Sequence, residues 1–473
     1  MNKTKIICTI GPASEDRETL KKLMNAGMNG ARFNFSHGTH EEQKEKMDMI
    51  KEVREELGLP VPIILDTKGP EIRTGNFGDG SVELKEGQKF TITTENMIGN
   101  GDVCSTTYKE LPKDVKPGDK ILIDDGLIEL TVDKVGEYEI QTTVNNGGMI
   151  KDKRGINVPG VSVNLPAITE NDKKDILFGI TQNIDFIAAS FIRKGKDVDY
   201  LRKFLNENDG DSVRIISKIE NKEGIDNIDD IIDASDGIMV ARGDMGVEIP
   251  AEDVPLTQKS IIRKCNRKGK FVITATQMLD SMIRNPRPTR AEVADVANAI
   301  LDGSDVVMLS GETAAGKYPV ESVEMLVNVA KSTEKGIDYD GTIKKHRASM
   351  EHSVTNAIGY ATCSSAESLG AEAIIAPTTS GYTARVMSSF RPQCPVISYS
   401  TSRRVMRRLA LVWGVIPYYH EYMDEADVFF ANVIEEAKHE GLIKDGDLIV
   451  LTAGLPLGIG GKTNMMRIHT VGE

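Results

Sequence analysis

Residues 214–248 read RIISKIENKEGIDNIDDIIDASDGIMVARGDMGVE. Two short apolar runs rich in Ile, Met and Val begin at Arg214 and Gly237, and the segment between them is amphipathic. Parallel strands joined by a crossover helix produce this pattern. The segment therefore predicts one complete strand–helix–strand unit.

The same pattern recurs along the chain. Eight apolar runs begin at Lys5, Ala31, Ile63, Asp185, Arg214, Gly237, Phe271 and Asp305. Successive starts lie 23 to 34 residues apart, except for a gap of 122 residues between the third and the fourth. A doubly wound open sheet is the alternative, but the regular spacing and the polar residues at many strand ends favour a closed eight-stranded β/α barrel with one insertion.

The long gap predicts an inserted domain of a different kind. Runs such as KFTITTE and EIQTTVN alternate or are β-branched, with Gly and Asp between them, which is typical of a small β-barrel. The chain therefore divides into a catalytic β/α barrel (residues 1–70 and 167–340), an inserted all-β domain (71–166) and a C-terminal α/β domain (341–473). The insertion leaves the face of the barrel that carries active sites, so we expect it to act as a lid. Residues 336–347, GIDYDGTIKKHR, are predicted to be a polar linker.

Composition excludes several classes of protein. Lys plus Arg is 58 and Asp plus Glu is 71, giving a net charge of −13, which argues against a nucleic-acid-binding protein. The five cysteines are scattered without a Cys-x-x-Cys spacing, so neither disulfides nor a zinc site are indicated. No apolar stretch is long enough to cross a membrane. We expect a cytoplasmic protein.

The predicted strands end in polar groups that would meet at one mouth of the barrel. Because side chains alternate along a strand, residues two apart are predicted to share a face. Three such groups occur: Arg32 with Asn34 and Ser36, Lys218 with Glu220, and Arg242 with Asp244. The set comprises Arg32, Asn34, Ser36, Asp66, Thr67, Lys218, Glu220, Arg242, Asp244, Thr276, Ser310 and Glu312. A single polar strand end is usually a cap, but a whole set at matching ends indicates a site.

The residue types suggest a reaction. Glu220 and Asp244 suit a hard divalent cation such as Mg²⁺. The cations near them suit an anionic phosphate or carboxylate; they are Arg32, Arg73, Lys218 and Arg242. A metal and fixed cations around a phosphoryl group are what phosphoryl transfer needs, and no P-loop or protein-kinase motif accompanies them.

Seven motifs resemble the pyruvate kinase family over essentially the full length of the chain. They are KIICTIGPAS, GARFNFSHG, LDTKGPEIRTG, IISKIENKEGI, IMVARGDMGVE, ATQMLDSMIRNPRPTRAEVADVANAILDGSD and MLSGETAAGKYPVE. The resemblance implies transfer of a phosphoryl group from phosphoenolpyruvate to ADP, giving pyruvate and ATP, the final step of glycolysis. It also implies a homotetramer, and the end of the chain at Glu473 implies that the extra C-terminal phosphotransferase-like domain of some bacterial relatives is missing.

The resemblance assigns roles to individual residues. Lys218, Thr276 and Arg32 would be catalytic. The substrate would contact Arg32, Lys218, Ala241, Arg242, Gly243, Asp244 and Thr276, partly through the main chain of 241–243. Glu220 and Asp244 would hold Mg²⁺ or Mn²⁺. The K⁺ site would comprise Asn34, Ser36, Asp66 and Thr67, and Glu71 is the variant that goes with K⁺ dependence. Nucleotide contacts would come from Asn34, Phe35, Ser36, His37, Arg73 and the lid residue Arg154.

A hydroxyl-rich loop in the C-terminal domain is predicted to bind a phosphorylated effector. The loop TTSGYT opens a predicted helix, whose free N–H groups favour an anion; its residues are Thr378, Thr379, Ser380, Gly381 and Thr383. The end loop AGLPLGIGGKTN lacks the Trp and Arg of relatives regulated by fructose 1,6-bisphosphate. AMP or a sugar monophosphate is therefore the expected effector.

Two other functions remain open at this point. A phosphoenolpyruvate or pyruvate lyase or aldolase on a related barrel would also use two carboxylates on Mg²⁺, but it gives the insertion and the K⁺ residues no role. A non-catalytic metabolite-binding regulator would be expected to lose Lys218, Glu220, Asp244 or Thr276, and all four are present.

Overall fold

The computed structural model describes residues 2–421, 425–457 and 461–473. Eight parallel strands close into a barrel in the order β1-β16-β15-β14-β13-β12-β3-β2. Their bounds are β1 Lys5–Thr9, β2 Gly30–Asn34, β3 Ile63–Asp66, β12 Phe186–Ala189, β13 Arg214–Ile219, β14 Gly237–Ala241, β15 Phe271–Ala275 and β16 Val306–Leu309. The predicted barrel is confirmed, because every predicted apolar run forms one of these strands.

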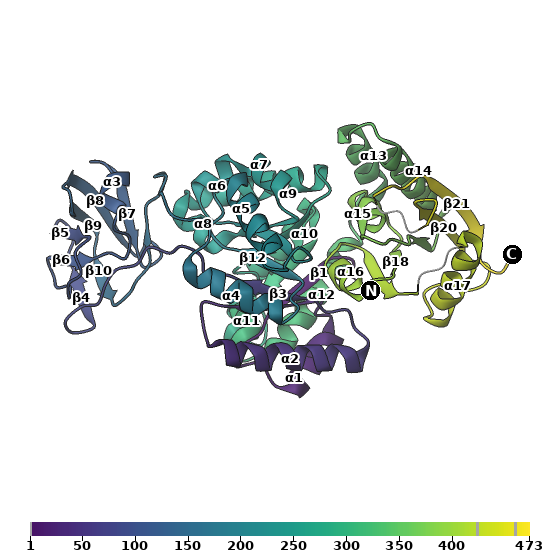
Figure 1. Cartoon of the computed structure of the whole chain (residues 1–473), viewed down its shortest axis with the longest axis horizontal. Helices are drawn as coiled ribbons and strands as arrows, with labels where there is room; N and C mark the ends of the chain where they lie inside the picture. The colour runs from purple at the N-terminus through teal and green to yellow at the C-terminus, as the bar shows by residue number, and fades with distance from the viewer. Residues whose placement is uncertain (1, 422–424, 458–460) are drawn as a thin grey trace.

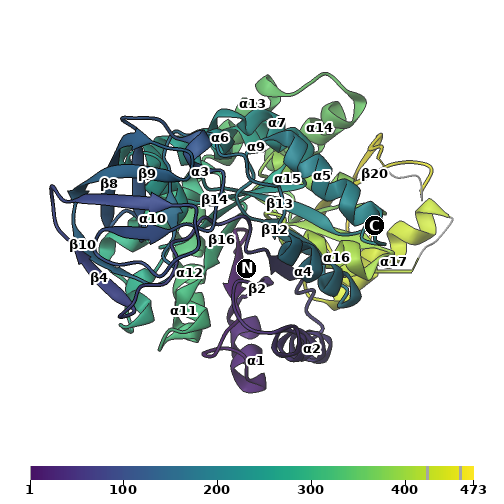
Figure 2. The same ribbon diagram turned by 60° about the vertical axis from the view of Figure 1, so that its left-hand side comes forward.

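Helices surround the barrel in the described chain (Figures 1 and 2). They are α1 Arg17–Ala26, α2 His40–Leu57, α4 Glu170–Thr181, α5 Gly195–Asn206, α6 Lys222–Asp226, α7 Ile228–Ala234, α8 Arg242–Glu248, α9 Val254–Arg267, α10 Arg290–Asp302, α11 Gly311–Ala314 and α12 Pro319–Glu334, with the short 3-10 turns Ala251–Asp253 and Asp280–Ile283. Local sequence fixes where several of them begin. The side chain of Thr289 accepts from the N–H of Glu292 and the Glu292 side chain accepts in return, so a capping box starts α10.

Between β3 and α4 the chain forms a separate β-rich segment. It consists of a six-stranded sheet in the order β11-β7-β8-β9-β5-β6 and a two-stranded sheet β10-β4. The elements are β4 Ser81–Leu84, β5 Lys89–Thr93, β6 Val103–Ser105, α3 Leu111–Asp114, β7 Lys120–Ile123, β8 Ile128–Val135, β9 Glu139–Asn146, β10 Gly148–Lys151 and β11 Ile156–Asn157. Its apolar core is its own, built from residues such as Phe90, Ile121 and Leu130.

The C-terminal part is a five-stranded sheet in the order β19-β18-β17-β20-β21 with helices around it. The elements are α13 Tyr339–Ser349, α14 Val354–Leu369, β17 Ala373–Ile375, α15 Tyr382–Ser389, β18 Val396–Ser400, α16 Arg403–Leu409, β19 Val415–Tyr419, α17 Ala426–His439, β20 Leu448–Ala453 and β21 Met465–Thr470. The predicted polar linker is wrong over most of its length. Asp338 caps α13, and Tyr339, Ile343 and His346 recur at helical spacing and are buried.

The inserted segment and the C-terminal part lie at opposite ends of the barrel (Figures 1 and 2). The junction with the C-terminal part is closely packed. Leu411 is fully buried in the cluster that also contains Ile7 and Phe186 of the barrel strands. Arg407 Nη2 lies 2.8 Å from Asp185 Oδ1, and Asp185 stands just before β12. The C-terminal part therefore closes the end of the barrel at which the strands begin.

Candidate active site

A buried lysine lies at the end of the barrel where the strands finish. Lys218, near the end of β13, donates to Asp66 Oδ1 at 3.1 Å and to Ser190 Oγ at 2.7 Å. Its Nζ lies 2.9 Å from Glu220 Oε1. Asp66 ends β3 and Ser190 directly follows β12. The barrel topology thus brings three strand ends to one ammonium group, as the sequence predicts for Lys218, Glu220 and Asp66.

Asp66 is shared between two cations. Arg32 Nε donates to Asp66 Oδ2 at 2.5 Å, and Arg32 Nη1 donates to Thr9 Oγ1 at 2.9 Å. Burial by itself would raise the pKa of Asp66, but Arg32 and Lys218 outweigh it and hold that pKa below its usual value. Burial would likewise lower the pKa of Lys218, and Asp66 and Glu220 reverse the effect. Both groups are therefore charged at neutral pH.

Two carboxylates stand beside this cluster. Burial raises the pKa of Glu220 to about 7 against the attraction of Lys218, and the charge of Asp244 adds to the rise. Burial also raises the pKa of Asp244. Glu220 Oε2 accepts from the Phe191 N–H at 2.6 Å. Two buried carboxylates close to each other repel one another. A divalent cation fits such a pair, because its positive charge would offset this repulsion.

A cation at this pair would need further oxygen ligands. Within residues 2–421, 425–457 and 461–473, no group of three or more His, Cys, Asp or Glu side chains is arranged to hold a metal ion. Glu220 and Asp244 thus offer two protein ligands, and a hard divalent cation takes about six. The remaining positions are suited to substrate oxygens and water.

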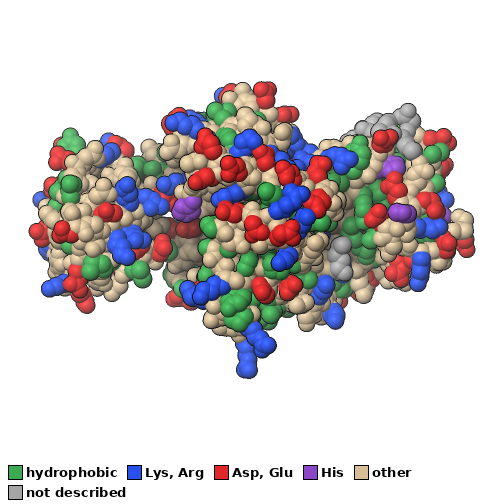
Figure 3. Space-filling view, turned by 90° about the horizontal axis from the view of Figure 1, so that it is seen from below, with side chains coloured by type: hydrophobic (Ala, Val, Ile, Leu, Met, Phe, Trp, Pro, Cys, Tyr) green, Lys and Arg blue, Asp and Glu red, His purple; other side chains and the backbone are tan. Residues whose placement is uncertain are grey.

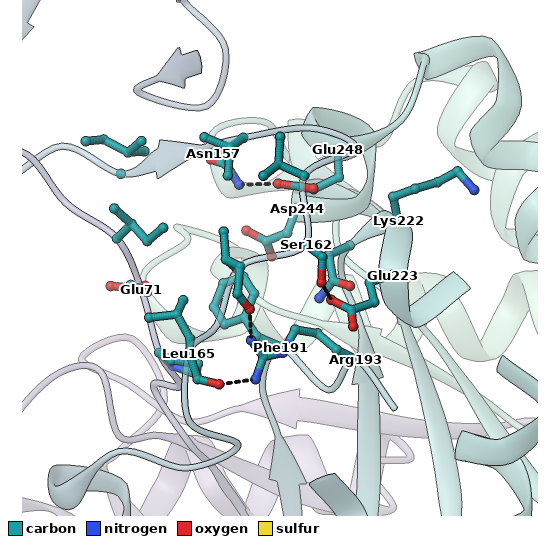
Figure 4. Close-up of a pocket in the computed structure, with 18 of the residues that line it drawn as sticks. Glu71, Asn157, Ser162, Leu165, Phe191, Arg193, Lys222, Glu223, Asp244 and Glu248 are labelled. Carbon is teal, nitrogen blue, oxygen red and sulfur yellow. Dashed lines mark hydrogen bonds between the residues drawn. The ribbon is translucent and has the colours of Figure 1, made fainter. Parts of the chain in front are cut away.

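The predicted shared face of Arg242 and Asp244 is wrong. β14 ends at Ala241 and α8 begins at Arg242, and residues two apart in a helix point in nearly opposite directions. The Arg242 guanidinium contacts both oxygens of Asp295, at 2.7 and 2.8 Å, and donates to the Thr276 carbonyl at 2.7 Å. The side chain of Arg242 therefore does not join the cation cluster, whereas Asp244 faces the cleft beside the barrel mouth (Figure 4).

Thr276 occupies a strained position next to α8. It follows β15 with φ at 68°, a left-handed conformation that β-branched residues seldom adopt. Its Oγ1 accepts from the Gly243 N–H at 2.9 Å and donates to the Ala275 carbonyl at 2.6 Å. A Cβ added to Gly243 would lie 3.7 Å from this hydroxyl. Thr276 and the main chain at Gly243 are thus held together, and their contact with a substrate stays a prediction.

The predicted K⁺ residues gather at neighbouring strand ends. Asn34 and Asp66 are register partners on β2 and β3. Asn34 Oδ1 accepts from the Ser36 N–H at 3.0 Å, and the Thr67 carbonyl accepts from Ser190 Oγ at 2.7 Å. Side-chain and main-chain oxygens are the donors that a monovalent cation takes. The four residues therefore offer oxygen donors suited to a monovalent cation, at the ends of β2 and β3.

The predicted nucleotide residues fall into separate places. Arg73 and Arg154 line a cleft of about 490 Å³ between the inserted segment and the barrel. Figure 3 shows the hollow that separates these two parts of the molecule on the face seen from below. Arg73 Nη2 lies 2.6 Å from Glu71 Oε2, and Arg154 Nη1 lies 3.2 Å from Asp124 Oδ1. Each arginine is thus already paired with a carboxylate.

The remaining nucleotide residues lie on the barrel. Asn34 and His37 line a second hollow of about 780 Å³ together with Pro12. Phe35 packs in the barrel core beside Phe178, with ring centroids 6.2 Å apart, so its side chain is structural. The structure does not bring all six predicted residues to one cleft.

Hydrogen bonds tie the returning strand of the inserted segment to the barrel (Figure 4). Asn157 donates to Glu248 at 2.9 Å and Ser162 donates to Glu223 at 3.0 Å. Arg193 Nη2 donates to the Leu165 carbonyl at 2.5 Å. These contacts fix one edge of the 490 Å³ cleft.

Two strand-end residues have different roles from those expected. Ser190 is absent from the predicted site, although it ends the fourth apolar run, DFIAAS, at the place where the other runs carry their functional groups. Glu312 was expected at the mouth but is buried, and its carboxylate accepts from the N–H groups of Leu279 and Ser310 at 3.0 and 2.8 Å. Glu312 therefore organises loops rather than facing a ligand.

The predicted effector loop opens α15. Ser380 is exposed, and Thr378 and Thr379 are half-buried. Gly381 has φ at 82° and precedes the helix, whereas Thr383 is buried and its hydroxyl lies 3.0 Å from that of Thr463. Three of the four hydroxyls thus remain accessible. The companion loop AGLPLGIGGKTN includes residues 458–460, which lie outside the described residues.

Together, these contacts define a β/α barrel with buried cations and carboxylates gathered at the ends of its strands. A family model described as the barrel domain of pyruvate kinase matches residues 1–323, and one described as its alpha/beta domain matches residues 356–469. The pyruvate kinase of Geobacillus stearothermophilus is 53% identical over 473 residues, covering all of this chain and 81% of that protein. The pyruvate kinase of Clostridium acetobutylicum is 51% identical, with full coverage of both chains.

A solved structure agrees with these sequence matches. The crystal structure of a pyruvate kinase from Cryptosporidium parvum superimposes with a TM-score of 0.96 at 43% identity, covering 99% of this chain and 96% of that one. The chain belongs to the pyruvate kinase family, and it is therefore a phosphotransferase. No helix among the described residues is long and apolar enough to cross a membrane.

Proposed function

We propose that this chain transfers the phosphoryl group of phosphoenolpyruvate to ADP. The bond between phosphorus and the enol oxygen breaks, a bond to a β-phosphate oxygen of ADP forms, and the enolate takes a proton at its methylene carbon to give pyruvate. The observation that carries the proposal is the buried ammonium of Lys218, fixed by Asp66, Ser190 and Glu220. A rigid, desolvated cation beside an open cleft is suited to charge that develops in a transition state.

Arg32 and Lys218 would bind the transferring phosphoryl group. Asp66 holds both side chains in place, so neither has to reorganise when negative charge develops. Arg32 is a planar donor and can contact two phosphate oxygens at once. Lys218 is a compact charge and suits the oxygens that move during transfer.

Glu220 and Asp244 would hold the divalent cation. When bound, Mg²⁺ or Mn²⁺ supplies a Lewis acid for the substrate oxygens. The raised pKa of both carboxylates, caused by burial, supports a site that gains stability from a cation. Lys218 links this pair to the phosphoryl-binding cluster through its contact with Glu220.

The substrate carboxylate and the final proton would be handled beside Thr276. The main chain of Ala241, Arg242 and Gly243 lies at the start of α8, beside Thr276, and would contact the substrate carboxylate. A threonine hydroxyl is too weak an acid to donate alone, so Thr276 would orient a water that protonates the enolate. The hydrogen bond from Gly243 holds the hydroxyl at the required place.

A K⁺ ion would add charge at the end of β2 and β3. Asn34, Ser36, Asp66 and Thr67 would supply oxygen donors. Glu71, which pairs with Arg73, would add negative charge. The nucleotide would lie between the barrel residues Asn34 and His37 and the arginines of the inserted segment. We expect the segment 71–166 to move as a lid that brings Arg73 and Arg154 toward the barrel mouth.

The reaction is tested by measuring pyruvate formed from phosphoenolpyruvate and ADP in four parallel mixtures. Two contain Mg²⁺ with either K⁺ or tetramethylammonium, and two contain the same monovalent cations with a chelator instead of Mg²⁺. We expect turnover that requires Mg²⁺ and rises with K⁺. Turnover that is equal with both monovalent cations would reject the K⁺ site, and no turnover in any mixture would reject the reaction.

We further propose regulation by a phosphorylated small molecule at the loop 378–383, in a homotetramer. The accessible hydroxyls of Thr378, Thr379 and Ser380 support an anion-binding role for the loop. The edge strand β21 with its exposed Ile468 supports a surface that other subunits cover. Light scattering is expected to give four times the chain mass of 51.8 kDa, and a T379V variant is expected to lose activation by AMP or ribose 5-phosphate.

A further inference from the structure

A second cleft, of about 660 Å³, lies between the barrel and the C-terminal part, at the end of the barrel opposite the catalytic mouth. From here on it is called the basal cleft. One wall comes from the beginnings of barrel strands and from the turn after α9. The other wall comes from α15, α16 and the turn between α13 and α14. The lining charged residues are Arg214, Asp236, Arg267, Lys268, Lys270, Glu351, Arg385 and Arg408.

The charge of the basal cleft differs from that of the whole protein. Six of its lining side chains are cationic and two are acidic, although the chain carries a net charge of −13. On the face drawn in Figure 3, by contrast, charged side chains of both signs are interspersed. A local excess of positive charge in an acidic protein needs a physical reason.

Several of these cations lack a carboxylate partner. Arg385 donates to the Ser380 carbonyl at 3.2 Å and Lys270 donates to the Ser235 carbonyl at 2.6 Å. Across the described residues, neither Arg385 nor Lys270 forms an ion pair. Nε of Arg408 is buried without a hydrogen-bond partner. Arg214 has a carboxylate at 3.6 Å, Asp236. The positive charges are therefore only partly compensated.

The cations also repel one another. Burial lowers the pKa of the Arg385 and Arg408 guanidinium groups, and the charge of Arg214 lowers each of them further. Burial lowers the pKa of Lys270 as well; the charges of Asp236 and Asp233 oppose this effect, and the charge of Arg385 adds to it. An anion in the cleft would relieve this repulsion and would meet guanidinium groups from both walls.

Part of the remaining lining is polar, from Asn356, Ser380 and Ser389, and the larger part is apolar. It includes Phe186, Phe271, Met350, Val386, Val405 and Val412. The rings of Phe186 and Phe271 pack edge to face with centroids 5.7 Å apart. This surface suits a ligand that carries an apolar or ring-shaped body next to its anionic group.

We propose that the basal cleft binds an organic phosphate, with its phosphate between Lys270 and Arg214 of the barrel and Arg385 and Arg408 of the C-terminal part, and its ring on the apolar lining. The cleft borders the effector loop at Ser380, which lines it, whereas Thr378, Thr379 and Thr383 do not line it. The bound phosphate joins the barrel to the C-terminal part. A ligand that bridges two packed units stabilises their arrangement by its binding free energy.

The test is calorimetric titration of the full chain with AMP, ribose 5-phosphate and inorganic phosphate, in buffer without other multivalent anions. The site variants are K270Q and R385Q. The matched control is K264Q, which removes a lysine of α9 that pairs with Asp229 outside the cleft. T379V tests the effector loop separately, so that failure of the regulatory proposal and failure of this one are distinguishable.

We expect an organic phosphate to bind the wild type, K264Q and T379V, and to lose about tenfold or more in affinity in K270Q and in R385Q. Circular dichroism and the unfolding temperature establish that both site variants are folded. Equal affinity in the wild type and in both site variants would overturn the proposal. So would loss of all binding in T379V alone, or absence of binding by all three probes up to about 10 mM.

Discussion

The two ends of the same barrel treat charge in opposite ways. At the catalytic mouth, Arg32 and Lys218 pair with Asp66 and Glu220, so each of these four charges has an opposite charge within 3.1 Å. At the basal cleft, six cations face two acids. Compensated charges fix side chains in one geometry, as a catalytic site requires, whereas like charges store repulsion that a ligand can remove. The catalytic mouth is therefore preorganised, whereas the basal cleft would gain stability when an anion binds.

The largest expected effect comes from breaking the compensated cluster. Replacing Lys218 with Met should reduce kcat by about a thousandfold or more, because the fixed cation that meets the transferring phosphoryl group is lost. Binding of phosphoenolpyruvate should remain within a few-fold, since Arg32 stays. The measurement is steady-state kinetics together with calorimetric titration of phosphoenolpyruvate.

The matched control for this variant is K203M, which removes a lysine of α5 whose partner is Glu207. Its kcat should match that of the wild type. A K218M protein that is folded and turns over at the wild-type rate would contradict the role given to the mouth cluster.

The next largest effect is on the free energy of unfolding, and it comes from protonating His346 near the basal end of the barrel. Burial, together with the charge of Arg391, lowers the pKa of His346 to about 4. Because an unfolded histidine titrates near 6.5, the folded state is stabilised above pH 6.5 and loses this contribution as the pH falls toward 4. Urea unfolding should show about 2 kcal/mol less stability at pH 5 than at pH 7 from this group alone.

The contribution of His346 is isolated by comparing the wild type with H346Q over the same pH range. The variant should have a flatter dependence of unfolding free energy on pH. H439Q, which removes an exposed histidine, should behave like the wild type. Identical slopes in the wild type and H346Q would contradict the assignment.

A smaller effect is expected from loosening Thr276 through Arg242. Asp295 holds the Arg242 guanidinium, which in turn holds the Thr276 carbonyl. Asp295→Asn keeps the shape but weakens the pair, and it should lower kcat about tenfold with little change in the KM for ADP. Asp302→Asn, on the same helix and paired with Lys259, is the control and should leave kcat unchanged. A fall in stability without a fall in kcat would make Arg242 purely structural.

The smallest expected effect is on the unfolding temperature, and it tests whether the cations of the basal cleft repel one another. In the absence of any phosphate, R385Q should raise the unfolding temperature by about 1 to 2 °C, because the variant removes a buried cation that neighbouring cations repel. Differential scanning calorimetry measures the shift. A lower unfolding temperature would mean that the cations are better compensated than their contacts indicate.

The barrel could be predicted from the sequence because each strand is a short apolar run with a regular spacing to the next. The capping box at Thr289 and Glu292 depends on residues three apart, so its sequence pattern is local. The grouping of Lys218 with Glu220 and Asp66 followed from the rule that strand ends of a barrel converge.

What the sequence did not predict depends on local backbone geometry or on distant partners. The start of α8 directly after Ala241 turned Arg242 away from the mouth, and an apolar run with a polar end does not reveal whether a strand or a helix follows. Among residues 339–348 of α13, whose burial the structure describes, three are buried and many of the others are charged, so the helical period was hidden. The pairing of Asp185 with Arg407 joins residues more than two hundred positions apart.

The central claim is that the mouth cluster transfers a phosphoryl group from phosphoenolpyruvate to ADP. The most direct test is phosphorus NMR of the wild-type protein with both substrates, Mg²⁺ and K⁺. The predicted result is loss of the phosphoenolpyruvate signal matched by an equal gain of the γ-phosphate signal of ATP. Release of inorganic phosphate instead, or no change in either signal with folded protein, would contradict the account.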